Sequence, residues 1–285
     1  MSKRANEIRY RYHSLHVFLI CSLLALFVLV TLFPFFWLFT ASIKEDKDII
    51  TRTLHILPPE VTFKHYITVF TFGKIGRIFL NTCIVALVTV LVSLIIIIPA
   101  AYALSVLRVR GREYISKFIL ALQMLPSILL TIPLYIMLQR IRLIDTYWAL
   151  ILSYTTFTIP FCFLLLSSYF RGLPYELFES AYLDGANSFY SMIKIAIPLT
   201  TPGIMTTGTY SFLMAWNDFL YANTFTSSTN TRTLTVEVIR LVGTWGNRWG
   251  DLAAGATVTV LPVIAVFLFA NKYIISGLTA GAVKG

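Results

Sequence analysis

The sequence predicts an all-α protein that crosses a membrane several times. Hydrophobic residues make up 57% of its 285 positions and charged residues only 13%, whereas soluble domains carry about 25% charged residues. The mean hydropathy is +0.77, and apolar runs of about 20 residues, long enough to span a bilayer, recur along the chain. A segment that crosses lipid alone must satisfy its own backbone hydrogen bonds, which a helix does. The run 91–98 is apolar throughout instead of alternating, which argues against a strand barrel.

Six such runs predict about six transmembrane helices. An even number places both termini on one side of the membrane, and short basic loops favour the cytoplasm. The short loop between the second and third runs is basic, with Arg108, Arg110, Arg112 and Lys117. We therefore expect a cytoplasmic segment over 1–15, a single transmembrane domain over 16–285 and two cytoplasmic termini. The predicted helices are 16–41, 78–106, 117–138, 147–169, 200–222 and 252–275.

The first run shares one feature with a signal peptide, namely the basic residues before it: Lys3, Arg4, Arg9 and Arg11. It is too long for a signal peptide, and it ends in the aromatic segment 33–37 without a small-residue cleavage site. We expect a retained helix.

Prolines interrupt the later runs, and proline kinks helices. Such kinks fit a transport path and plain packing equally well. The three cysteines lie within runs and show no metal-ligand spacing. We assign the net charge of +10 to residues that flank the membrane and expect no nucleic-acid partner, since no soluble segment is large enough for one. The prolines are Pro99, Pro126, Pro133 and Pro160, and the cysteines are Cys21, Cys83 and Cys162.

A polar segment at about 171–200 separates the fourth and fifth runs. Pro174 suits the first position of a helix, and Glu176 suits its first turn. We expect this helix to cover 174–183. Asp184 then lies near its negative end, where the N–H groups of a following helix can offset its charge.

A tight turn and a second short helix are expected next. Gly185 supplies the permissive backbone for the turn. Asn187 or Ser188 can cap the second helix, and Pro198 and Pro202 end or kink it. The segment therefore predicts a helix–turn–helix at the cytoplasmic face.

Two functions fit this segment on chemistry alone. Glu179, Asp184 and Gly185 can simply shape an interfacial loop. Alternatively, Phe178 and Tyr182, which share a face at i,i+4 spacing, form a docking surface for the groove of a partner.

Two stretches of the segment resemble the EAA loop of permease subunits of ATP-binding-cassette importers. They are Glu179-Ser-Ala-Tyr-Leu-Asp184-Gly185-Ala186 and Ile195-Ala-Ile-Pro198-Leu199. Over nearly its whole length the chain is similar to the MalG-like group of sugar permeases. The supporting stretches are Asn81-Thr, Ala101-Tyr-Ala-Leu104, Gly111-Arg112, Gln123-Met-Leu-Pro126, Ile132-Pro-Leu-Tyr135, Ile159-Pro-Phe161, Ala215-Trp-Asn-Asp218 and the tail Ser276–Gly285.

The resemblance implies a type I importer permease fold, in which the first helix of the polar segment is a coupling helix that docks on a cytoplasmic ATPase. Ser180 stands where the motif usually has a second alanine, a minor departure because serine is also small. The residues implied for coupling are Phe178, Glu179, Ala181, Tyr182, Asp184 and Gly185.

The resemblance also implies the partners. Two ATPase subunits would bind ATP and magnesium, a second, MalF-like permease would pair with this chain, and an extracytoplasmic solute-binding protein would deliver a sugar. The turn-rich loop at 244–247 is a candidate contact for that binding protein. The chain lacks a G-x-x-x-x-G-K-[ST] loop, so we expect neither catalysis nor a bound cofactor. Such permeases belong to the bacterial or archaeal cell membrane.

Polar side chains within the runs are candidates for a substrate path, because such groups are costly in lipid and often functional. Aromatic rings can stack on the C–H faces of a sugar, and amides or carboxylates can bind its hydroxyls. Structural alternatives stay open: Trp216 and Asp218 as outer anchors of the fifth helix, Asn81 and Gln123 as hydrogen-bond links between helices. The candidates are Asn81, Gln123, Tyr154, Tyr210, Ser211, Trp216, Asn217 and Asp218.

Other functional classes fit less well. A secondary transporter would show ionisable relays inside the runs, and the sequence has almost none. A membrane enzyme would show a clustered nucleophile, metal set or acid–base pair there. A permease for a glycerol phosphodiester or a polyol stays open, since the binding protein and the pore lining select the solute.

Overall fold

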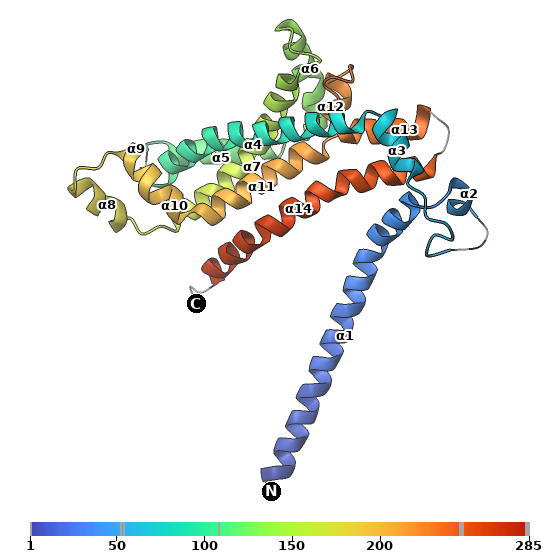
Figure 1. The fold of residues 1–285 in the computed structure, drawn as a ribbon. Helices are drawn as coiled ribbons and strands as arrows, with labels where there is room; N and C mark the ends of the chain where they lie inside the picture. Colours follow the sequence, from blue (N-terminus) through green and yellow to red (C-terminus); the bar gives the residue numbers. More distant parts are fainter. Residues whose placement is uncertain (1, 52, 54, 108, 245–247, 283–285) are drawn as a thin grey trace. The chain divides into compact units, whose positions relative to one another are not determined.

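The computed structural model describes residues 2–51, 53, 55–107, 109–244 and 248–282. Every regular element within these residues is a helix (Figure 1). The chain forms two compact units. Unit 1 comprises Met1–Phe72 and Leu241–Thr257, and unit 2 comprises Gly73–Arg240 and Val258–Gly285.

Unit 1 begins with a long helix that runs through residue 16 without a break, so the expected boundary between 1–15 and 16–285 stays a prediction. Among the described residues, none buries the most apolar part of this helix, within 16–42. The elements of unit 1 are α1 (Ser2–Ser42), α2 (Asp46–Ile49), α3 (Lys64–Thr71), the end of α13 (Leu234–Thr244) and the start of α14 (Trp249–Ala282).

Three long helices pack together as the core of unit 2. Small and hydroxyl-bearing side chains line their contacts, as is usual between helices in lipid. Ser93 and Thr158 form a hydrogen bond of 3.1 Å. Gly203 allows a close approach, because a Cβ atom there would lie 2.5 Å from the ring of Tyr169. The three helices are α4 (Ile75–Ser105), α7 (Tyr147–Arg171) and α11 (Thr201–Asn217).

Shorter elements connect the core helices of unit 2. Two of them, α9 and α10, are joined by a π-helical turn, η2. The shorter elements are α5 (Arg112–Gln123), the 3₁₀ turn η1 (Ser127–Leu130), α6 (Thr131–Arg140), α8 (Glu176–Leu183), α9 (Ser188–Ser191), η2 (Met192–Ala196), α10 (Ile197–Leu199) and α12 (Leu220–Phe225).

Four described helices are long and apolar enough to cross a membrane. They confirm the predicted spans 16–41, 78–106, 147–169 and 252–275. The observed spans are His16–Ser42, Ile75–Ser105, Tyr147–Arg171 and Trp249–Lys272.

The predicted helix over 117–138, with a kink expected at Pro126, is broken in two. The chain there forms two helices, Arg112–Leu122 and Ser127–Arg140, that meet at 91°. Pro126 lies at the break with an extended backbone, and proline cannot donate the N–H that would continue the first helix. Such a bent pair fits either a broken fifth span or a re-entrant loop.

The predicted single helix over 200–222 is wrong. α11 ends at Asn217 after 17 residues, and Asp218 is extended. Its Oδ2 accepts hydrogen bonds from the backbone N–H groups of Tyr221 (3.1 Å) and Ala222 (3.0 Å), so the carboxylate starts α12 as a cap would. A sixth membrane crossing therefore stays a prediction.

Candidate coupling site at the α8 loop

The α8 loop, residues 172–200, joins α7 to α11 and contains the polar segment singled out by its sequence. α8 begins at Glu176, two residues later than predicted, because Pro174 opens a preceding turn in which its carbonyl accepts from Leu177 N (3.4 Å). Glu176 and Glu179 occupy the first turn of α8, where carboxylates favour the helix dipole.

The end of α8 is fixed by backbone geometry. Gly185 has φ of +84°, a left-handed conformation that glycine adopts without strain. Gly185 N donates to Tyr182 O (3.1 Å), and Ala186 N donates to Ala181 O (2.9 Å). These two bonds form a Schellman motif. The tight turn predicted at Gly185 is confirmed.

Asn187 begins the next helix, as one of the two predicted caps. Its Oδ1 accepts from Tyr190 N at 2.8 Å, which satisfies a free N–H group at the start of α9. The prediction that these N–H groups offset Asp184 is wrong, since Asn187 caps the helix instead. Among the described residues, no hydrogen bond reaches the exposed Asp184 side chain.

The structure corrects the role expected for Phe178. Its side chain is 1% exposed and lies edge-on to the ring of Tyr102, with centroids 5.9 Å apart. Tyr102 in turn contacts Phe170 at the end of α7. Phe178 therefore anchors α8 to α4 and α7 and cannot be an exposed contact for a partner. Tyr182 is half-buried, with its hydroxyl 3.5 Å from that of Tyr102.

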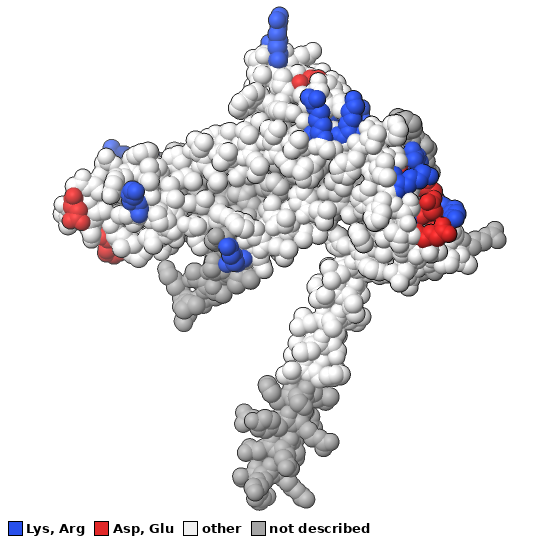
Figure 2. Space-filling view, in the orientation of Figure 1, with Lys and Arg blue, Asp and Glu red and all other residues white. Residues whose placement is uncertain are grey.

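Other side chains of the loop face solvent. Leu183 is 89% exposed, and Leu177, Phe189 and Tyr190 are also exposed. Sequence reasoning missed Leu183, although it follows Phe178 by five residues and therefore lies on a different side of the helix. Acidic and basic side chains both lie at this end of unit 2 (Figure 2).

Several predicted substrate-path residues are instead held inside unit 2. Asn81 is buried, donates to Arg232 O (3.0 Å) and accepts from Tyr147 Oη (2.6 Å). Trp216 is 0% exposed, and its Nε1 donates to Thr259 O (3.1 Å). These bonds agree with the structural alternative for Asn81 and exclude Trp216 as an exposed interfacial anchor.

The remaining path candidates make separate contacts. Tyr154 Oη donates to Asp218 Oδ2 at 2.9 Å, and Tyr210 packs on the ring of Phe161. Ser211 is buried and lies 3.3 Å from the Sγ of Cys162. Gln123 and Asn217 are exposed.

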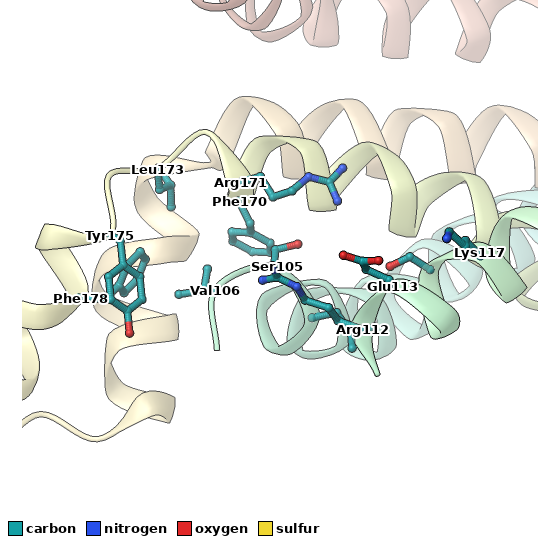
Figure 3. Close-up of a pocket in the computed structure, with 12 residues that line it drawn as sticks. Ser105, Val106, Arg112, Glu113, Lys117, Phe170, Arg171, Leu173, Tyr175 and Phe178 are labelled. Atoms are coloured by element: carbon teal, nitrogen blue, oxygen red, sulfur yellow. The ribbon is translucent and has the colours of Figure 1, made fainter. Parts of the chain in front are cut away.

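A cavity of about 580 Å³ does lie beside α8, where α4, α5 and α7 end or begin (Figure 3). Phe178 is the only predicted site residue in its lining. No group of three or more His, Cys, Asp or Glu side chains suited to a metal occurs within the described residues. The loop segment 245–247, most of the expected contact for a binding protein, lies outside the described residues.

Comparison with known proteins decides the family. Residues 93–279, which include α7, the α8 loop and α11, match the family described as binding-protein-dependent transport system inner membrane component. The chain belongs to this family. The permease is therefore a multi-pass membrane subunit of a binding-protein-dependent transport system, and the secondary-transporter and enzyme alternatives are set aside.

Relatives cover nearly the whole permease. It is 38% identical to the inner membrane ABC transporter permease protein YcjP of Escherichia coli, over 92% of this chain and 94% of that protein. It is 33% identical to the trehalose/maltose transport system permease protein MalG of Thermococcus litoralis, over 91% and 94% of the two chains. A crystal structure of a bacterial ABC transporter that imports alginate shares the fold, with a TM-score of 0.80 at 24% identity over 93% of this chain and 98% of that one.

Proposed function

We propose that the permease is a transmembrane subunit of an ATP-driven importer for a sugar or an oligosaccharide. The observation that carries the proposal is the α8 loop, a short helix anchored by buried Phe178 that presents exposed Leu183 beside carboxylates. The substrate class is supported by relatives, one named for trehalose and maltose and one that imports alginate.

The proposal assigns the remaining subunits as follows. α8 docks in a cleft of one of two ATPase subunits, which hold ATP and magnesium while this chain holds neither. A second, MalF-like permease pairs with this chain, and a solute-binding protein delivers the sugar from the opposite side. Both termini lie with α8 in the cytoplasm.

The proposed mechanism depends on the packing of α8 against the ends of α4 and α7. Closure of the ATPase subunits on ATP draws the paired coupling helices together. Because Phe178 packs on Tyr102 of α4, which packs on Phe170 of α7, a displacement of α8 moves the ends of two spans. The bundle then opens outward to receive the sugar, and hydrolysis restores the inward-facing state.

The test is co-purification of the tagged permease from its native membranes in mild detergent. In Gly185→Val a β-branched residue would have to adopt the left-handed backbone, at a cost of ~1–2 kcal/mol. The turn that ends α8 should therefore be disrupted, and the ATPase should no longer co-purify with the permease. Gly185→Asn should still co-purify with the ATPase, since asparagine tolerates the left-handed conformation.

Gly111→Val is the matched control. Gly111 also has a positive φ of +82° and open space around its Cβ position, but it lies outside the α8 loop. ATPase retained by Gly185→Val, or lost equally in Gly111→Val, would count against the coupling role. Uptake of labelled oligosaccharides by cells that lack the chain tests the substrate class separately.

A further inference from the structure

The cavity beside α8 lies at a membrane boundary. Three membrane-associated helices have an end in its wall: α4 ends at Ser105, α5 begins at Arg112 and α7 ends at Arg171. All three ends border the same cavity, so they lie on the same side of the bilayer. A ligand in the cavity would therefore sit at the depth of lipid headgroups.

The wall of the cavity is rich in positive charge. Arg112, Lys117 and Arg171 border it together with one carboxylate, Glu113, which leaves an excess of two positive charges from three cations and one anion. Figure 3 shows Arg112, Glu113 and Arg171 bordering the same space from α5 and α7. Among the described residues, none of these four side chains forms a salt bridge within 4.0 Å. The positive charge is thus available to a ligand.

Apolar side chains form the rest of the cavity. Val106, Phe170, Leu173 and Phe178 line it next to the cations, so the site suits a molecule with an anionic group joined to an apolar part. The neighbouring surface of α5 is also apolar, since Phe118 is exposed. That surface offers a path from the lipid phase into the cavity.

We propose that this cavity binds a phosphate group, and that its source is the headgroup of an anionic phospholipid. Guanidinium groups bind phosphate oxygens through paired N–H donors, and basic pockets between transmembrane helices on the cytoplasmic side bind anionic headgroups. The apolar wall accommodates the glycerol and the first part of an acyl chain. The proposed coupling role assigns no part to these cations.

The test uses the full chain in detergent without any ATPase, so its outcome is independent of the coupling role. Native mass spectrometry counts bound lipid, and a thermal melt reports stabilisation, with phosphatidylglycerol, phosphatidylcholine and inorganic phosphate as separate probes. We expect phosphatidylglycerol to remain bound and to raise the melting temperature more than phosphatidylcholine at equal concentration. Equal effects of the two lipids would overturn the proposal, and an equal effect of inorganic phosphate would reject the lipid as its source.

Charge variants locate the binding. Arg112→Gln and Arg171→Gln should each weaken phosphatidylglycerol binding about fivefold, the contribution typical of one basic residue at an anionic surface. Glu113→Gln should strengthen binding, because it removes the carboxylate of the cavity. Arg140→Gln, which removes an exposed cation of α6 outside the cavity, should leave binding unchanged. The proposal would be overturned if Glu113→Gln left phosphatidylglycerol binding unchanged or weakened it, or if Arg140→Gln lost as much binding as the cavity variants. Both outcomes can be read even if Arg112→Gln and Arg171→Gln prove unstable.

Discussion

The α8 loop and the cluster around His65 in unit 1 both place charged side chains among apolar helices, and they differ in what those charges contact. In the loop, Glu179 and Asp184 are exposed, and no side-chain hydrogen bond within the described residues involves them. In unit 1, Asp251 is 3% exposed. Its Oδ1 lies 2.8 Å from His65 Nδ1, and its Oδ2 lies 3.1 Å from Arg248 Nε.

Both ring nitrogens of His65 have a partner. Its Nε2 lies 2.8 Å from the carbonyl oxygen of Lys44, and its Nδ1 faces the carboxylate of Asp251. A carbonyl and a carboxylate both accept hydrogen bonds, so each ring nitrogen of His65 faces an acceptor. The polar groups of the cluster thus satisfy one another, and Arg248 and Asp251 form an ion pair within it. The carboxylates of the loop have no partner among the described residues, so they stay available to a binding partner. A charged segment in the sequence can therefore be either a binding surface or an internal cluster, and charge alone does not tell which.

The largest expected difference in stability between the two regions comes from removing one carboxylate from each. Asp251→Ala removes the buried partner of both His65 and Arg248, and breaking a buried pair costs about 3–5 kcal/mol. Asp184→Ala removes an exposed charge and should change stability by no more than about 0.5 kcal/mol. Thermal melts of the two full-length variants measure the difference. Similar melting temperatures would show that the His65 cluster does not contain a structural ion pair.

Phe178→Ala is expected to have the next largest effect. Deleting a buried phenylalanine side chain costs about 3 kcal/mol or more, and here the loss also frees α8 from Tyr102. The variant should melt earlier and also co-purify less ATPase. A stable variant with normal ATPase binding would contradict the role of Phe178 as the anchor of α8.

Asp145 offers a pH-dependent comparison, since it is satisfied like Asp251 but less buried. Burial raises the pKa of Asp145, but hydrogen bonds from Thr231, Ser227 and Ser228 outweigh burial and lower the pKa to about 2. A carboxyl group whose folded pKa lies below its unfolded value of about 4 stabilises the fold above pH ~4 and loses this contribution as pH falls toward 2.

The measurement is the difference in melting temperature between the permease and Asp145→Asn, taken at intervals from pH 6 to pH 3. The difference should be constant above the unfolded pKa and shrink below it. A difference that does not change with pH would show that Asp145 is not ionised more readily in the folded chain.

Leu183→Ser should have the smallest effect on stability. The side chain is 89% exposed, so the melt should shift by no more than about 0.5 kcal/mol in free energy. ATPase co-purification should nevertheless fall, because the variant loses an apolar contact without disturbing the anchor of α8. Phe189→Ser on α9 tests whether the contact extends beyond α8. A large loss of stability would place Leu183 inside the fold.

Much of the fold could be predicted because membrane spans depend on local composition. Four spans were predicted to within a few residues from apolar length alone. A kink at Pro126 was expected but not a turn of this size, and the break at Asp218 was not predicted. An apolar window does not distinguish a kink from a 91° turn, and the capping role of Asp218 depends on where α12 begins.

The candidate site shows the same division between local and distant causes. The turn at Gly185 and the cap at Asn187 depend on neighbouring residues, and both were predicted. The burial of Phe178 and the internal bonds of Asn81 depend on partners far along the chain, such as Tyr102 and Arg232. Spacing within one segment carries no information about such partners.

The Schellman motif at Gly185 has a further consequence for recognition. Two backbone hydrogen bonds close α8, and the Asn187 cap starts the next helix two residues later. A segment held in this way has little conformational entropy left to lose when another protein binds it, so more of the contact energy remains as affinity. The loop can then be modest in area and still be recognised, because it is ordered before the encounter.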